Sequence, residues 1–120
     1  MIQSIELSEG VPLRLFRDNR FKQGCLSLQF VRPMSRQEAA LNALLPNVLL
    51  RGTAKTPDLR SITLRLDDLY GASIGPLARR AGDYQLSGLF CGFIEDKYAL
   101  NGDAVFDPMV AFLKEILFMP

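Results

Sequence analysis

The sequence predicts an α+β domain in which a largely antiparallel β-sheet carries helices on one face. Three observations favour this class. Strand-like alternation of apolar and polar residues comes in groups that share short turns. Helical patterns follow these groups, two in succession in the middle of the chain and one at its end. Strands grouped with hairpin partners are typical of an antiparallel sheet, not of repeated β-α-β units.

The composition is that of one ordinary globular domain. The 120 residues are 48% hydrophobic and 22% charged, and 14 basic residues against 13 acidic ones give a net charge of +1. This balance lacks the basic excess typical of nucleic-acid-binding proteins, so we expect no nucleic acid as a partner. The N-terminus lacks a secretory pattern, and no apolar run approaches the ~18 residues of a membrane helix. We therefore expect a cytoplasmic protein that does not bind membranes.

The first third of the chain is predicted to form strands. Residues 2–7 alternate as a short strand that ends at a turn, and residues 11–15 alternate as a second. Pro12 favours an edge position for the second strand. Residues 26–30 alternate as a third strand, which we expect to pair with the second as in a hairpin.

A buried helix is predicted within Ser35 to Thr53, the longest helical pattern and the most apolar segment of the chain. Ser35 and Glu38 have the spacing of a capping box, which predicts the start of the helix. Gly52 lies just past the last apolar residue, where a left-handed cap costs glycine nothing. The segment has almost no polar face, so we expect other elements to cover this helix on most sides.

The second half of the chain is predicted to hold a helix, a strand pair and a last helix. Pro57, near the first helical position, opens a helix with an apolar stripe from Leu59 to Tyr70. Residues 73–79 and 84–93 form the strand pair. The last helix begins at Asp107, and its apolar stripe comprises Met109, Phe112, Leu113, Ile116 and Leu117.

Glycines and cysteines inside the predicted strands carry further expectations. Gly88 and Gly92 weaken their strand unless another segment packs closely there. Cys25 and Cys91 lie in strand-like alternation with no C-x-x-C motif around either. We expect them to pack as small hydrophobes, with a disulfide as the less favoured alternative.

The chain contains no histidine, which excludes catalytic triads and His-based zinc sites. The adjacent acidic pairs, Asp67-Asp68 and Glu95-Asp96, point apart on a helix and are expected to be solvated surface. The serines lack a neighbouring base that would activate them. The residues alone therefore predict a domain with no catalytic residue, no cofactor and no bound metal.

Two segments carry the pattern of a known family. Leu-Leu-Arg-Gly-Thr at residues 49–53 closes the buried helix, and Asp-Leu-Tyr-Gly-Ala-Ser at residues 68–73 ends the next one. They resemble the N-terminal part of the pitrilysin/insulinase family of zinc metallopeptidases, the inverzincins. The resemblance covers residues 1–120 and implies the N-terminal part of one longer peptidase-like α+β domain, with the order β-β-α-α-β-β-α. The abrupt apolar end at Pro120 agrees with a truncated domain.

In active members of this family, the helix before Arg-Gly-Thr carries H-x-x-E-H, whose two His bind zinc and whose Glu is the general base. The resemblance places the first His on Ala43, the Glu on Pro46 and the second His on Asn47. These three residues are called the motif positions below. The third ligand of such enzymes would lie beyond Pro120. Within the family, residues 42–46 look like the bacterial non-peptidase group named for its association with aminopentanol modification of elongation factor P.

Pro46 predicts a kink in the buried helix. A mid-helix proline removes the hydrogen bond to the carbonyl of Asn42, at a cost of about 3 kcal/mol unless the helix bends. Either Asn42 or Asn47 satisfies this carbonyl with its side-chain amide, or both amides face solvent.

The resemblance implies a catalytically inactive domain that acts by association. Its expected partner is an active peptidase homologue or second lobe, which gives a hetero-oligomer in which this chain supports the structure or binds a peptide or protein substrate. Two alternatives stay open: a peptidase whose activity depends on residues or a partner outside this fragment, and a module that binds peptides along a sheet edge. Apolar surface left uncovered on a fragment would also favour self-association.

Overall fold

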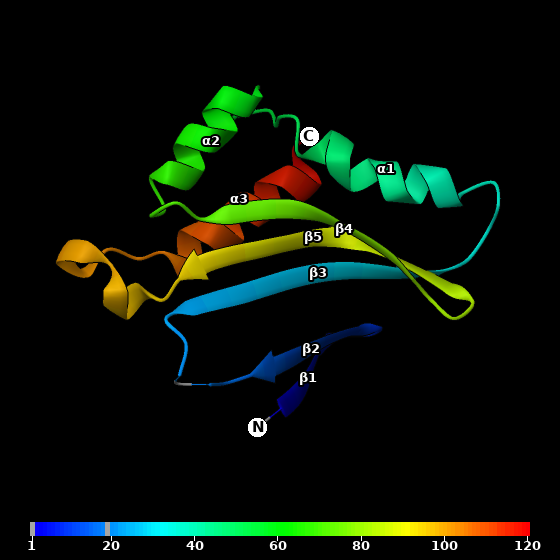
Figure 1. The fold of residues 1–120 in the computed structure, drawn as a ribbon, viewed down its shortest axis with the longest axis horizontal. Coiled ribbons are helices and arrows are strands. Elements are labelled where there is room, and N and C mark those ends of the chain that lie inside the picture. Colours follow the sequence, from blue (N-terminus) through cyan, green and yellow to red (C-terminus); the bar gives the residue numbers. More distant parts are fainter. Residues whose placement is uncertain (1, 19) are drawn as a thin grey trace.

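The computed structural model describes residues 2–18 and 20–120, which form the strands and helices drawn in Figure 1. In chain order the elements are β1 (Ile2–Ser8), β2 (Val11–Phe16), β3 (Gln23–Pro33), α1 (Ala39–Leu49), α2 (Leu59–Asp67), β4 (Ser73–Ala81), β5 (Tyr84–Ile94) and α3 (Phe106–Phe118). Two short 3-10 turns, η1 (Asp96–Tyr98) and η2 (Leu100–Gly102), connect β5 to α3.

Three strands form one antiparallel sheet in the order β3-β5-β4. The central strand, β5, pairs along its whole length with β3 on one side and along most of its length with β4 on the other. β1 and β2 form a separate antiparallel hairpin, which Figure 1 shows beyond the β3 side of the sheet. The predicted α+β class with antiparallel strands is therefore confirmed.

The pairing predicted between the second and third strands is wrong, because β2 pairs with β1 while β3 pairs with β5. β3 and β5 are both 11 residues long, and their register puts Leu26 and Leu28 on the same face as the buried Cys91 and Leu89. A pairing with β2 would bury far less, since β1 is exposed throughout and β2 over most of its length. Burial of apolar surface thus outweighs closeness in sequence.

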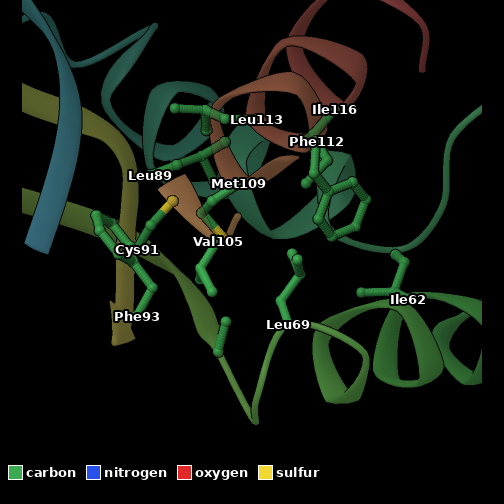
Figure 2. Close-up of a cluster of buried hydrophobic side chains, with 11 residues drawn as sticks. Ile62, Leu69, Leu89, Cys91, Phe93, Val105, Met109, Phe112, Leu113 and Ile116 are labelled. Carbon is green, nitrogen blue, oxygen red and sulfur yellow. The ribbon is translucent and has the colours of Figure 1, made fainter. Parts of the chain in front are cut away.

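The core lies between the sheet, α2 and α3, where Figure 2 shows the apolar side chains gathered. Met109, Phe112 and Ile116 of α3 are fully buried, and Leu113 is nearly so. The predicted stripe of the last helix is confirmed, with Leu117 partly buried beside it. The remaining members of the core are Ile62, Leu69, Ala72, Leu89, Cys91, Phe93 and Val105.

α3 begins at Phe106, one residue before the predicted start, and Asp96 holds its first turn. Asp96 Oδ1 accepts hydrogen bonds from the backbone N–H groups of Phe106 at 2.9 Å and Val105 at 2.8 Å. These bonds lower the pKa of the Asp96 carboxyl. A residue that the sequence assigns only to solvated surface therefore also positions the helix that builds the core.

α2 begins at Leu59, and Asp58 is its N-cap: Oδ1 of Asp58 accepts a hydrogen bond from the backbone N–H of Ser61 at 2.7 Å. Pro57, predicted near the first helical position, lies one residue before this cap. Ile62 of the predicted stripe is buried, whereas Leu59 in the first turn of the helix is exposed.

α1 is shorter at both ends than the sequence predicts. In place of the expected capping box with Ser35, the Glu38 carboxylate pairs with Arg32 of β3 at 3.2 Å. Gly52 has a φ outside the left-handed region, so the expected left-handed cap is also wrong. Glycine is required there for a different reason, since a Cβ would lie 2.5 Å from the carbonyl oxygen of Pro57.

The expectation that other elements cover α1 on most sides is wrong. The helix lies against β4 and β5 on one side, and its opposite side is open. Four apolar residues on the open side, at i, i+3, i+4 and i+7, form what we call the outer stripe. The exposed fractions of these side chains are 65% for Leu41, 55% for Leu44, 55% for Leu45 and 52% for Val48. Within the described part of the chain, helices are too short or too polar to span a bilayer.

The two cysteines differ in environment although both lie in the sheet. Cys91 is fully buried, as expected, and burial raises the pKa of its thiol to about 11, which makes it a poor nucleophile. Cys25 is exposed, so the expectation that it packs as a small hydrophobe is wrong. Cys25 pairs in register with Gly92, not with Cys91, and both thiols are unbonded.

Candidate functional site

The motif positions share one side of α1, opposite the outer stripe. Ala43, Pro46 and Asn47 are spaced i, i+3 and i+4, which places them on the side that also contacts the sheet. Gln85 of β5 binds this side of the helix, because its Nε2 donates to the carbonyl of Ala39 at 2.8 Å. Ala43 is half-buried, Pro46 is buried and Asn47 is exposed. Within this side of α1, Pro46 is therefore covered and Asn47 is open to solvent.

The residues at the motif positions do not fit a zinc ion. The Ala43 and Pro46 side chains have no ligand atom, and Nδ2 of Asn47 donates to the Ala43 carbonyl at 3.4 Å. Across residues 2–18 and 20–120, no three His, Cys, Asp or Glu side chains come close enough together to hold a metal ion. The pyrrolidine ring of Pro46 cannot accept a proton, so this residue cannot act as a general base. No step of zinc-dependent hydrolysis follows from this side of α1.

α1 runs through Pro46 as one helix. The side-chain amides of Asn42 and Asn47 neither bind the freed carbonyl of Asn42 nor both face solvent. Nδ2 of Asn42 donates to Oε1 of Gln85 at 3.3 Å, and Nδ2 of Asn47 donates to the Ala43 carbonyl. Asn42 thus fastens α1 to β5, and only Asn47 lies at the surface. The kink at Pro46 stays a prediction.

A buried polar cluster joins the loop after α1 to α3. Glu115 is 5% exposed, and its Oε2 accepts hydrogen bonds from Oγ1 of Thr53 at 2.6 Å and Oγ1 of Thr56 at 2.5 Å. Its Oε1 accepts a hydrogen bond from Nη1 of Arg65 at 2.7 Å. The Arg65 guanidinium also lies over the ring of Phe112, with Cζ 4.4 Å from the ring centroid. Thr53, Thr56, Arg65 and Glu115 are called the Glu115 cluster below.

The Glu115 cluster keeps its carboxylate ionised. Burial acts to raise the pKa of Glu115, but the hydrogen bonds from Thr53, Thr56 and Arg65, with the charge of Arg65, outweigh burial and lower the pKa to about 2. Sequence analysis missed this cluster, although a carboxylate beside the apolar stripe of the last helix was a signal for it. Both carboxylate oxygens are used to hold the loop and α2 against α3, so we assign the cluster a structural role.

We expect the cluster to make the chain less stable in acid. Because the pKa of Glu115 in the folded chain lies below its ordinary value of 4.5, the unfolded chain takes up the proton first, and stability falls as the pH drops from about 4.5 to about 2. The loss should be roughly 2 kcal/mol, since Arg65 is 35% exposed and water screens the pair. Urea unfolding followed by circular dichroism over this pH range measures it.

The matched variant for this prediction is Glu115→Gln, which should flatten the acid limb of the pH profile while lowering stability at neutral pH. Glu38→Gln, which removes the exposed ion pair with Arg32, serves as the control and should leave the acid limb unchanged. Parallel pH profiles for the wild-type chain and Glu115→Gln would contradict the assignment.

Both segments that carry the family resemblance change the direction of the chain. In residues 49–53, Oγ1 of Thr53 accepts a hydrogen bond from the backbone N–H of Thr56 at 2.9 Å, which closes the turn after α1. In residues 68–73, Tyr70 and Gly71 have positive φ values of 62° and 71°, which turn the chain from α2 into β4. The motifs therefore serve the fold.

Two shallow hollows lie on the surface of α1, one along its open side and one at its end. One, of about 270 Å³, is lined by the outer stripe and Asn42. The other, of about 400 Å³, continues past the end of the helix to Arg51, Ala54 and Pro120. Val48 lines both hollows, and we call the two mainly apolar hollows together the outer trough.

The comparisons with known proteins agree with a metallopeptidase-like chain. No family model matches it. Over 111 residues, 92% of this chain, it is 26% identical to a Bacillus subtilis (strain 168) protein named "Probable inactive metalloprotease YmfF", of which it covers 26%. A conserved protein from Enterococcus faecalis V583, known from a crystal structure, matches with a TM-score of 0.93 and 27% identity, over 99% of this chain and 28% of its own.

The chain therefore spans about a quarter of the length of each of these two proteins. Its sequence is similar to that of a protein whose name describes a probable inactive metalloprotease, which agrees with the expectation of a chain without catalytic activity. The high TM-score shows that the arrangement of strands and helices described above also exists in a solved structure.

Proposed function

We propose that this chain is a catalytically inactive metallopeptidase-like domain that acts as a structural or substrate-binding partner of an active peptidase homologue. The observation that carries the proposal is the state of α1: the helix keeps its place against the sheet, but Ala43, Pro46 and Asn47 supply neither a zinc ligand nor a base. The inactive metalloprotease named among the relatives supports it. A domain that keeps the scaffold without its chemistry can contribute only through contacts.

The finer family assignment is part of the same proposal. Residues 49–53 and 68–73 support the pitrilysin/insulinase family, in which inactive and active lobes associate, and residues 42–46 support the group associated with elongation factor P modification. Partner lobes of this kind enclose a peptide, which gives an inactive domain a role in holding substrate.

A second candidate function is peptide binding along a sheet edge. β3 pairs with β5 on one side, and among the described residues no strand pairs with its other side. Phe30 and Val31 near the end of this strand are 54% and 61% exposed. An extended peptide added there would gain main-chain hydrogen bonds and apolar contacts. Binding of extended peptides by the chain alone, with no homologue present, would favour this candidate.

The first test is zinc binding and peptide cleavage by the purified chain. We expect less than about 0.1 zinc per chain after dialysis against zinc, and no cleavage of a broad peptide library, because the motif positions lack ligands. Ala43→His with Asn47→His is the positive control, since two histidines one helical turn apart bind zinc measurably. Stoichiometric zinc with peptide turnover by the wild-type chain would overturn the proposal and favour a peptidase.

The second test is association with an active metallopeptidase homologue from the same genome. Co-expressed, the two chains should elute as one complex in size-exclusion chromatography, and calorimetry should give a defined stoichiometry. Turnover by the homologue should change when this chain is added. Separate elution of all such homologues, with unchanged turnover, would overturn the partner role.

A further inference from the structure

The chain has more surface than a compact domain of its size. Its accessible surface is 8759 Å², whereas a monomeric protein of 13.4 kDa has roughly 6,500 Å². Its radius of gyration is 15.5 Å, against about 13.6 Å for a compact chain of this length. The surplus surface exceeds the roughly 800 Å² that one partner contributes to a standard interface. A stable partner could therefore be accommodated on surface that the chain leaves open.

The outer stripe is a regularly spaced apolar part of this additional exposed surface. Its four side chains stand at the spacing that one face of a helix presents to another helix, and each is more than half exposed. The outer trough extends this surface beyond the end of α1, from Leu41 to Pro120. A shallow, mainly apolar surface beside a helix fits an amphipathic helix better than it fits a small molecule.

The basic residues that flank the outer stripe favour a partner with acidic side chains. Residues 34–55, which comprise α1 and its two flanks, hold three basic residues and one acidic residue. That acidic residue, Glu38, is already paired with Arg32. Arg36 before α1 and Arg51 after it are exposed, and Arg51 lines the outer trough next to Val48. A partner that brings carboxylates to these two ends gains electrostatic attraction, and one that brings cations is repelled.

We infer that the outer stripe is the docking surface for an amphipathic helix of a partner protein, whose apolar side chains fill the outer trough and whose flanking carboxylates meet Arg36 and Arg51. This inference rests on the proposed function and names the surface through which the chain associates. A second copy of the chain fits less well, because its own α1 would bring the same basic residues against these arginines.

The test uses the whole chain and two labelled synthetic helical peptides with the same leucine stripe, one flanked by Glu and one by Lys. Fluorescence anisotropy should show the Glu-flanked peptide binding at least about tenfold more tightly at about 20 mM salt, with a smaller difference at about 300 mM. Leu44→Glu should weaken binding of both peptides by about tenfold or more. Arg51→Glu should reduce the preference for the Glu-flanked peptide.

Leu64→Glu is the matched control, because Leu64 on α2 is 56% exposed and Leu44 is 55% exposed. It should leave peptide binding unchanged, and circular dichroism should show that all variants stay folded. Equal binding of both peptides, or equal effects of Leu44→Glu and Leu64→Glu, would overturn the inference. So would a dimer in sedimentation velocity that Leu44→Glu dissociates, since the occupant would then be a second copy.

The outcomes also separate this inference from the proposed function. If the chain binds an active homologue and Leu44→Glu leaves that complex intact, the proposed function stands and the docking surface is wrong. If the Glu-flanked peptide binds to the outer stripe but every active homologue elutes separately, the surface stands and the proposed function is wrong.

Discussion

Replacing Phe112 by alanine should lower the free energy of unfolding by about 4 kcal/mol. The ring is fully buried, lies on the side of the core that faces α2 in Figure 2, and carries the guanidinium of Arg65 from α2 on its face. Truncation therefore removes apolar burial, leaves a cavity and deprives Arg65 of a contact within the Glu115 cluster. Urea unfolding at neutral pH measures the loss.

Phe118→Ala is the matched control for this prediction. Phe118 lies on the same helix, but its side chain is 78% exposed, so the same truncation should change stability by less than about 0.5 kcal/mol. Similar losses for the two variants, or a loss below about 1 kcal/mol for Phe112→Ala, would show that the core is not centred on α3.

Replacing Gly88 by valine should destabilise the chain by about 3 kcal/mol, because the side chain has no room. A Cβ on Gly88 would overlap the backbone carbonyl of Leu28 and lie 3.0 Å from Cα of Gln29. β3 would have to move away from β5, which breaks the pairing that joins the first part of the chain to the core. Urea unfolding gives the loss, and amide hydrogen exchange should show β3 losing protection while α3 keeps it.

Gly75→Val is the control, since Gly75 lies in β4 of the same sheet and a Cβ there meets no heavy atom within 4 Å. Valine suits a strand, so the change in stability should stay within about 0.5 kcal/mol. If Gly75→Val proved as damaging as Gly88→Val, the cause would be valine in the sheet and not the close approach of β3.

Local signals in the sequence predicted the elements better than their partners. The stripe from Met109 to Leu117 and the strand pair before it follow from periodicity, and the structure confirms them. The close packing that would justify a glycine at position 88 is also present. The partner of β3 could not be predicted in this way, because pairing with β5 depends on apolar burial between segments some sixty residues apart.

The open side of α1 was missed for a related reason. An all-round apolar pattern indicates that a helix needs cover, but it does not say whether this chain supplies the cover. The predicted start of the helix was wrong because the helix begins after Glu38, whose carboxylate pairs with Arg32 across the bend from β3. Local capping rules do not include such partners from another element.

The candidate site was predictable only in part. The absence of histidine and the identities at Ala43, Pro46 and Asn47 follow from the sequence together with the family resemblance. The Glu115 cluster could not be predicted from the sequence, because Thr53 and Glu115 lie 62 positions apart in the chain. They come together only when the chain folds and brings α1 and α3 close to each other. The hydrogen bond from Asn42 to Gln85 is equally non-local.

The Glu115 cluster also has a consequence for the entropy of association. Thr53 and Thr56 bind Glu115, and the backbone N–H of Ala54 donates to the carbonyl of Met119 at 2.8 Å, so the loop after α1 is anchored to α3 at several points. Asn42 and Gln85 fasten the other half of the helix to the sheet. A partner that binds α1 meets a surface already held in place, and little conformational freedom is lost when the complex forms.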